Sequence, residues 1–354
     1  MTTPTYRLTG VHHVSSLSAH IGRSHDFYTR VLGLRPVIRT VNQDDTSMYH
    51  LFFGDGAGTP GSDMTVFDMP LAARERRGNN SISRTTFRVN GAATLAWWAE
   101  RLTSLGVAHA GVTERNGRAV LDFDDWEGTE LSLVDDGGAG DAFPWADSPV
   151  PAEHQLRGLG YTTITVPVLE PTDRFLTEGL GLGRSHTYPL ASDARFTVHV
   201  YTIGQGGAHA EVHVVVRDDL PRAGYGAGGV HHVALRVPAG ARLVEWTQHL
   251  DALGYRNSGI VDRHYFASVY VREPNHVLFE LATDGPGFTV DGPLDGDRLS
   301  LPPFLEPRRA EIEAGLRTIR AEPQSIDDPV DQSVSRSVTG RDGTVRPATD
   351  RLID

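Results

Sequence analysis

The chain of 354 residues is long enough for two domains, or for one large domain with a sizeable core. Hydrophobic residues make up 39% and charged residues 22%, as in ordinary soluble globular proteins. The formal net charge of −12 argues against nucleic acid or an anionic membrane as a partner. Because there is no cysteine, disulfides, thiolate nucleophiles and cysteine-ligated metals are excluded, which leaves histidine, aspartate and glutamate as metal ligands.

The N-terminal sequence MTTPTYRLTG has neither the basic stretch nor the apolar stretch of a secretory signal. The chain also contains no apolar run of 18 or more residues. We therefore expect a cytoplasmic protein without a membrane segment.

One unit is repeated four times along the chain. A Leu-Gly pair closes four helix-like stretches, at 32–33, 105–106, 180–181 and 253–254. Glycine is favoured there because it adopts the left-handed conformation that ends a helix without a Cβ penalty. Strand-like runs precede the helices, at 12–18, 83–89, 161–168 and 231–237, and further runs follow, at 47–53, 119–125, 195–203 and 265–273. Each unit therefore reads as β-α-β-β-β.

A single unit of this kind would leave one face of its small curved sheet bare, so the units should pair. We expect an α+β fold of four βαβββ units that form two paired curved-sheet barrels. The predicted parts are a first pair of units at 8–136 (8–70 and 80–136), a linker at 137–156, a second pair at 157–285 (157–216 and 229–285), a C-terminal loop and helix at 286–323, and a polar tail at 324–354.

Two copies of Gly-Val-His-His and one later acid suggest a metal site. Neighbouring side chains of a strand face opposite sides. Val14 marks the helix-facing side of the first strand, and Val233, Leu235 and Val237 mark that of the last one. Alternation then puts His13, Ser15 and His232 on the concave face, with His12 and His231 on the helix-facing side. In NHVLFELA the same rule puts Glu280 on the concave face. The three concave ligands, His13, His232 and Glu280, can share a metal only if units 1 and 4 are neighbours.

These residues carry a resemblance to a known family. The four units, the HHV pairs and VLFELATD resemble the vicinal oxygen chelate superfamily, which includes glyoxalases, bleomycin resistance proteins and extradiol dioxygenases. Within it they are similar to the dioxygenases that cleave the ring of hydroquinones. The resemblance covers about 8–320, and its most specific stretches are 41–67, 262–291 and 301–313.

The resemblance implies Fe(II), with Mn(II) as an alternative, held by His13, His232 and Glu280. It implies a small aromatic diol and O₂ as substrates. The residues implied to orient ligands or substrate, or to move protons, are His12, Ser15, His231, Arg263 and Tyr270. Two histidines and a carboxylate form the facial triad of non-haem Fe(II) oxygenases, which suits this chemistry. A homodimer is a further expectation.

Alternative interpretations remain for several residues. Arg263 could hold negative charge on a bound oxygen or form a surface ion pair, and Tyr270 could donate to bound oxygen or only pack in the core. The superfamily also includes glyoxalase-type isomerases and metal-free proteins that sequester drugs. An isomerase would need a fourth protein ligand, for which Asp68 is the only candidate.

Overall fold

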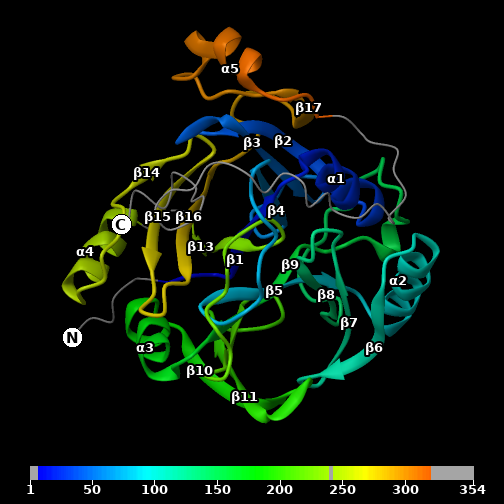
Figure 1. Cartoon of the computed structure of the whole chain (residues 1–354), viewed down its shortest axis with the longest axis vertical. Coiled ribbons are helices and arrows are strands. Elements are labelled where there is room, and N and C mark those ends of the chain that lie inside the picture. The colour runs from blue at the N-terminus through cyan, green and yellow to red at the C-terminus, as the bar shows by residue number, and fades with distance from the viewer. Residues whose placement is uncertain (1–6, 239–241, 320–354) are drawn as a thin grey trace.

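The computed structural model describes residues 7–238 and 242–319, which form many strands and few helices. The helices α1 to α4 lie around the outside, and the strands fill the centre (Figure 1). The predicted tail at 324–354 lies outside the described residues.

Each unit has the predicted order of strand, helix and strands. Unit 1 contains β1 (Val11–Ser18), α1 (Ile21–Asp26), the π-helical turn η1 (Phe27–Val31), β2 (Arg35–Asn42), β3 (Asp45–Gly54) and β4 (Asp63–Asp68). Unit 2 contains β5 (Ser81–Val89), α2 (Ala92–Ser104), β6 (His109–Arg115), β7 (Arg118–Asp124) and β8 (Glu130–Asp135), and a 3₁₀ turn η2 (Ala152–His154) follows it.

The second pair of units repeats this order. Unit 3 contains β9 (Leu159–Val166), α3 (Leu169–Arg174), the π-helical turn η3 (Phe175–Gly179), β10 (Gly183–Leu190), β11 (Asp193–Thr202) and β12 (Glu211–Val216). Unit 4 contains β13 (Val230–Val237), α4 (Leu243–Ala252), β14 (Val261–Asp262), β15 (Phe266–Arg272) and β16 (Leu278–Pro286). The C-terminal segment adds β17 (Asp295–Leu299), η4 (Glu306–Arg308) and α5 (Arg309–Gly315). The glycines at the four predicted helix ends have φ of 71° to 81°.

Strand pairing joins unit 1 to unit 4 and unit 2 to unit 3. β1 runs antiparallel to β13, and β5 runs antiparallel to β9. The first half therefore has the order β17-β2-β3-β4-β1-β13-β16-β15-β14, and the second half has the order β6-β7-β8-β5-β9-β12-β11-β10. Among the described residues no pairing closes either half, so each is an open curved sheet. The α+β fold class and the predicted meeting of units 1 and 4 are confirmed, whereas the predicted barrels are open sheets in the described residues.

Each of the four central strands carries one extra residue where it meets its partner. Between the pairs Val11–Leu235 and His13–Ala234, β1 has the additional residue His12. Between the pairs Ser15–His232 and Ser16–Val230, β13 has the additional residue His231. The β5–β9 pair has matching register shifts, at Ser83 in β5 and at 160–161 in β9. Such bulges interrupt the alternation of a strand and redirect its side chains.

The helices cover the convex faces of the sheets. Leu235 and Phe279, from β13 and β16, are buried in one large cluster with Trp246 and Leu250 of α4. Residues at odd spacing from them, such as Ala234 and Ala282, face the concave side and pack with Phe266. The helix-facing and concave sides of β13 and β16 thus follow the predicted alternation.

The C-terminal segment packs over the β2–β3 hairpin. β17 pairs with β2, and Ile312 of α5 forms a cluster with Val41, Leu301 and Leu305. The hydroxyl of Tyr265 also donates to Ser300 Oγ over 3.2 Å. This segment therefore supports the outer wall of the first half.

No helix in the described part of the chain combines the length and the apolar content that a membrane crossing requires.

A buried carboxyl group connects the two halves. Glu127, in the β7–β8 turn of unit 2, is 6% exposed, and its Oε1 accepts a hydrogen bond of 2.8 Å from the backbone N–H of Ala19, just after β1. Burial, helped by the nearby Asp125, raises the pKa of Glu127 to about 8. The folded protein therefore binds this proton more tightly than the unfolded chain does.

This shift predicts a pH-dependent loss of stability. The favourable contribution of the protonated carboxyl is complete below the unfolded pKa and is lost as the pH rises toward 8. Glu127→Gln, which keeps an oxygen for Ala19, should raise the free energy of unfolding above pH 8 by a few kcal/mol, roughly, and change it little near pH 4. Urea unfolding at both pH values measures the difference; equal effects at the two would contradict the prediction.

Candidate metal centre

Three predicted ligands from three adjacent strands converge in the first half. β1 supplies His13, β13 supplies His232 and β16 supplies Glu280, and all three side chains are at least 98% buried. The Nε2 atoms of the two histidines are 3.1 Å apart, and Glu280 Oε2 lies 3.2 Å from the Nε2 of His13 and 2.9 Å from that of His232. Their ligand atoms all lie within 4.8 Å of one another, so the group could hold a metal ion.

The neighbouring histidines direct the lone pairs of the ligands inward. His12 Nε2 lies 3.2 Å from the carbonyl oxygen of Thr283, so this nitrogen carries the proton. Burial, together with the nearby His13, lowers the pKa of His12 to about 3, so its Nδ1 is a bare acceptor at neutral pH. His13 Nδ1, 2.9 Å away, then donates to it. The other ring nitrogen of His13, Nε2, faces the centre.

The second histidine pair repeats this contact. His231 Nδ1 and His232 Nδ1 are 2.6 Å apart, and the Nε2 of His232 faces the centre. Burial lowers the pKa of His232 to about 4, so its imidazole is neutral at pH 7 and able to ligate.

The charge balance of the three side chains suits a cation. Burial alone would raise the pKa of Glu280, but the adjacent His13 and His232 hold it well below its usual range. Glu280 Oε2 is buried and accepts no hydrogen bond from any described residue, whereas Oε1 accepts one from Ser268. An uncovered carboxylate oxygen facing two imidazole nitrogens is electrostatically costly unless a positive charge lies among them. The residues therefore fit a metal ion.

The positions of His12 and His231 differ from the prediction. Strict alternation put both on the helix-facing side, but each is the extra residue of a bulge. The ring of His12 lies 5.2 Å from that of Phe266, and the ring of His231 lies 5.7 Å from that of Phe67, and both of these phenylalanines line the concave cavity. The bulge is the physical reason, because it lets two successive side chains turn toward the same face.

A chain of hydrogen bonds leads from the ligands to the cavity wall. Ser15 Oγ lies 2.9 Å from His232 Nε2 and 2.7 Å from Thr65 Oγ1, which in turn lies 2.8 Å from His50 Nε2. Burial lowers the pKa of His50 well below its usual value, so this imidazole is neutral. The predicted residue Ser15 thus touches a ligand directly.

Beside the triad, Arg263 forms a hydrogen bond with Tyr270 and an ion pair with Asp44. Arg263 Nε donates to the Tyr270 hydroxyl over 3.1 Å, and its Nη2 donates to Asp44 over 2.9 Å. Burial raises the pKa of Tyr270, so the phenol stays protonated, while Tyr270 and Asp44 outweigh burial to raise the pKa of Arg263. Gln43 Nε2 donates to the Arg263 backbone oxygen over 2.9 Å. The turn between β2 and β3 therefore holds Arg263 at the cavity, and Arg263 is not a surface residue.

The cavity at the triad is narrow and largely aromatic. His13, His232, Arg263 and Tyr270 line it from the inner side. Its remaining walls come from Thr40, Val41, Asn42, Gln43, His50, Phe52, Phe67, Tyr265 and Phe266. Aromatic walls exclude water and suit a flat ring.

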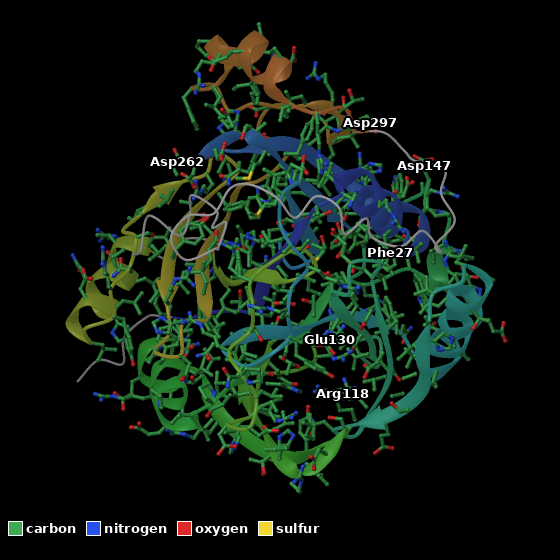
Figure 2. All side chains as sticks on the ribbon, viewed as in Figure 1. Phe27, Arg118, Glu130, Asp147, Asp262 and Asp297 are labelled. Carbon is green, nitrogen blue, oxygen red and sulfur yellow. The ribbon has the colours of Figure 1, made fainter. Side chains whose placement is uncertain are left out.

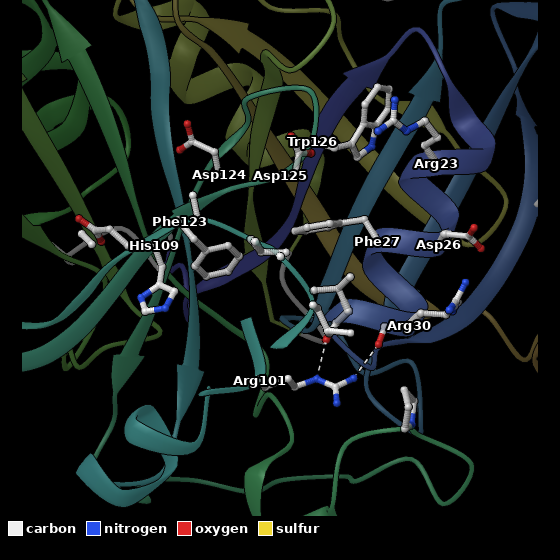
Figure 3. A pocket seen from close by; sticks show the side chains of 18 of the residues that line it. Arg23, Asp26, Phe27, Arg30, Arg101, His109, Phe123, Asp124, Asp125 and Trp126 are labelled. Carbon is white, nitrogen blue, oxygen red and sulfur yellow. Dashed lines mark hydrogen bonds between the residues drawn. The ribbon is translucent and has the colours of Figure 1, made fainter. Parts of the chain in front are cut away.

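A larger cleft lies elsewhere in the molecule. It has a volume of about 1250 Å³ and lies between α1–η1 and the β6–β7 side of unit 2, and its lining includes Phe27 and Phe123 (Figure 3). Arg101 donates there to the backbone oxygens of Val31 and Arg30, which ties unit 2 to unit 1. Among the described residues, the one cluster of three metal-ligating groups lies at the smaller cavity and not at this cleft.

The second half has no metal-ligand set among the described residues. By the bulge pattern Arg84 of β5 stands where β1 has His13, and it pairs with Glu130 at 2.8 Å. Tyr161 and His213 stack there with ring centroids 3.9 Å apart. Arg118 and Glu130 of this half are labelled in Figure 2.

Asp68, the candidate fourth ligand of an isomerase, is paired with an arginine. Asp68 is 2% exposed and forms an ion pair with Arg317 of the C-terminal segment. In unit 1 the position that corresponds to Glu280 is Thr65, because Ser15 pairs with Thr65 as Ala234 pairs with Glu280. The donor set therefore has three members, which does not favour the isomerase.

Known proteins share both sequence and fold with this chain. Residues 158–281 match the model of the Glyoxalase/Bleomycin resistance protein/Dioxygenase superfamily. A protein of Bacillus subtilis named "Putative ring-cleaving dioxygenase MhqA" is 46% identical over 317 residues, which cover 89% of this chain and 100% of the relative. The chain belongs to the ring-cleaving dioxygenases of this superfamily.

Other members of the superfamily agree with this assignment. The chlorohydroquinone/hydroquinone 1,2-dioxygenase of Sphingobium indicum is 32% identical over 88% of this chain and 96% of its own length. A solved dioxygenase-family structure from Bacillus subtilis superposes with a TM-score of 0.81 at 31% identity, over 90% of this chain and 99% of that one. Maize glyoxalase I shares the fold, with a TM-score of 0.55 at 13% identity over 78% of this chain and 92% of its own.

Several site residues of this ring-cleaving dioxygenase were not predicted. Ser268 and Thr65 face the centre, and alternation from Tyr270 and from the repeat could have identified them. Asp44 and Asn42 could not be assigned, because their roles depend on contacts with parts of the chain that only the fold brings near.

Removal of single histidines should separate ligands from orienting residues. His13→Ala and His232→Ala should each abolish stoichiometric binding of Fe(II), whereas His12→Ala should weaken it about 10- to 100-fold, because the ligand loses only its orientation. Anaerobic metal titration measures this. His50→Ala, a buried histidine outside the triad, is the matched control and should bind metal normally. Equal loss from all four variants would contradict the assignment.

Proposed function

We propose that this protein is an Fe(II)-dependent dioxygenase that opens the ring of a hydroquinone with O₂. The observation that carries the proposal is the buried triad of His13, His232 and Glu280 at the base of an aromatic cavity. Two imidazoles and one carboxylate are the donor set of non-haem Fe(II) oxygenases. The name of the Sphingobium relative supports a hydroquinone as the substrate class.

The three ligand side chains would hold the metal with a total charge of −1, which leaves a net positive centre that favours an anionic substrate oxygen. When bound, Fe(II) would offer neighbouring positions for a phenolate and for O₂ and would transfer electron density between them. His12 and His231 fix the ligand orientation through the contacts between their Nδ1 atoms and those of His13 and His232.

The remaining groups act on the substrate. The guanidinium of Arg263 stays charged and can stabilise negative charge that develops on a substrate or dioxygen oxygen. The protonated Tyr270 hydroxyl accepts from Arg263 and has its own proton to donate to a bound oxygen. Phe52, Phe67 and Phe266 would exclude water from the ring.

Oxygen uptake tests the proposal. Protein loaded with Fe(II) under argon should consume one O₂ per hydroquinone on exposure to air, and Glu280→Gln should lose both metal and activity. Glu273→Gln, at a buried glutamate in the turn between β15 and β16 that accepts a hydrogen bond from Thr172, is the matched control and should retain activity. Turnover of a thiohemiacetal without oxygen uptake would instead establish an isomerase.

The ion pair of Arg263 with Asp44, in the β2–β3 turn, should affect the reaction rate. Asp44→Asn removes the partner of Arg263, so the guanidinium loses its fixed position, and kcat/KM should fall roughly tenfold while the metal content stays the same. Asp45→Asn is the matched control, because among the described residues the Asp45 carboxylate accepts hydrogen bonds only from Ser47. Equal kcat/KM values for Asp44→Asn and the unaltered protein would show that the function of Arg263 does not depend on its ion pair with Asp44.

A further inference from the structure

One buried amide in the cavity has donors that no described residue uses. Asn42, at the end of β2, lines the cavity of the triad and is 3% exposed. Its Oδ1 accepts a hydrogen bond of 2.9 Å from the backbone N–H of Asp44. Its Nδ2 is buried and has no hydrogen-bond partner.

The orientation of this amide is determined by its own turn. The backbone N–H of Asp44 can only donate, so the atom that faces it must be the oxygen of Asn42. Exchange of the oxygen and nitrogen would bring two donors together. The NH₂ group must therefore point away from the turn, and the side chain it belongs to lines the cavity.

A buried donor without an acceptor is costly, so such groups are uncommon in proteins and call for an explanation. The side-chain amide of the next residue, Gln43, does have an acceptor, because its Nε2 donates to the backbone oxygen of Arg263. Within the turn, the unpaired amide is therefore that of Asn42. Thr40 Oγ1, two residues earlier on β2, is the other buried atom of this strand that belongs to a cavity-lining residue and lacks a hydrogen-bond partner among the described residues.

Strand register places Asn42 at the end of the cavity that is remote from the triad. Thr65 of β4, which contacts Ser15 beside His232, pairs with Phe52 of β3. The next row outward contains Phe67, His50 and Thr40. Asn42 follows Thr40 by two residues on β2 and so lies one row further out on the same face. The side chains of Phe52, Phe67 and His50 lie between it and the ligands.

We propose that the NH₂ group of Asn42 recognises the substrate oxygen that does not bind the metal. A ring that places one oxygen at the triad and lies between the aromatic walls would direct its para substituent toward β2. A para-hydroxyl can accept a hydrogen bond from Nδ2 and so satisfy the unpaired donor. In an ortho-diol both oxygens lie at the metal end, and the donor stays unpaired. Asn42 is therefore a specificity-determining residue that selects para-diols.

This inference rests on the proposed function, and ligand binding under argon tests it without turnover. Fe(II)-loaded protein is titrated calorimetrically with hydroquinone and with 4-methylphenol, in which a methyl group replaces the para-hydroxyl. The unaltered protein should bind hydroquinone about tenfold more tightly or better. In Asn42→Leu, which has a similar volume and no donor, the ratio of the two affinities should fall to about one.

The control variant is Gln43→Leu, which removes a paired amide from the same turn. It should leave the affinity ratio as it is, even if both ligands bind more weakly. Catechol should bind Asn42→Leu and the unaltered protein with similar affinity. A ratio that is near one in the unaltered protein, or unchanged in Asn42→Leu, would overturn the inference and indicate that water satisfies the amide. Absence of both oxygen uptake and ligand binding would instead contradict the proposed function.

Discussion

The antiparallel pairing of β1 with β13 is the contact on which the rest of the structure depends. It brings together two histidine pairs that are 219 residues apart, and it places Glu280 beside them through the parallel pairing of β13 with β16. Neither half-site is complete alone, since unit 1 contributes one ligand and unit 4 contributes two. The site therefore exists only where the first and the last unit meet.

The bulges explain why the histidines occur in pairs. In a regular strand two successive side chains face opposite sides, so His12 could not reach the ring of His13. The extra residue at 12 and its counterpart at 231 bring each pair together at their Nδ1 atoms. The bulge in each strand thus places the residue that orients the ligand directly before the ligand itself. The other ring nitrogen of His12, Nε2, is held in turn by the carbonyl oxygen of Thr283.

Much of the architecture could be predicted from the sequence, because it depends on local patterns. Glycine at the helix ends and alternation along the strands located the units, and alternation alone put His13, His232 and Glu280 on one face. The bulges escaped prediction, since an extra residue is defined only relative to a partner strand. For the same reason the position in unit 2 that matches His13, Arg84, is identified only by the register of β5 with β9. The contact of Asp44 with Arg263 spans 219 residues and has no local signal.

Thr65 occupies the position in unit 1 that corresponds to Glu280 in unit 4, so the metal-ligating set has a carboxylate on one side only. The two histidine strands are related by an approximate two-fold axis, which would be complete if unit 1 also ended in a carboxylate on β4. Because a small neutral hydroxyl stands there, the one carboxylate of the triad lies on the β16 side, and on the β4 side Thr65 Oγ1 is hydrogen-bonded to Ser15 and His50. The broken symmetry thus gives the donor set one charged side and one neutral side.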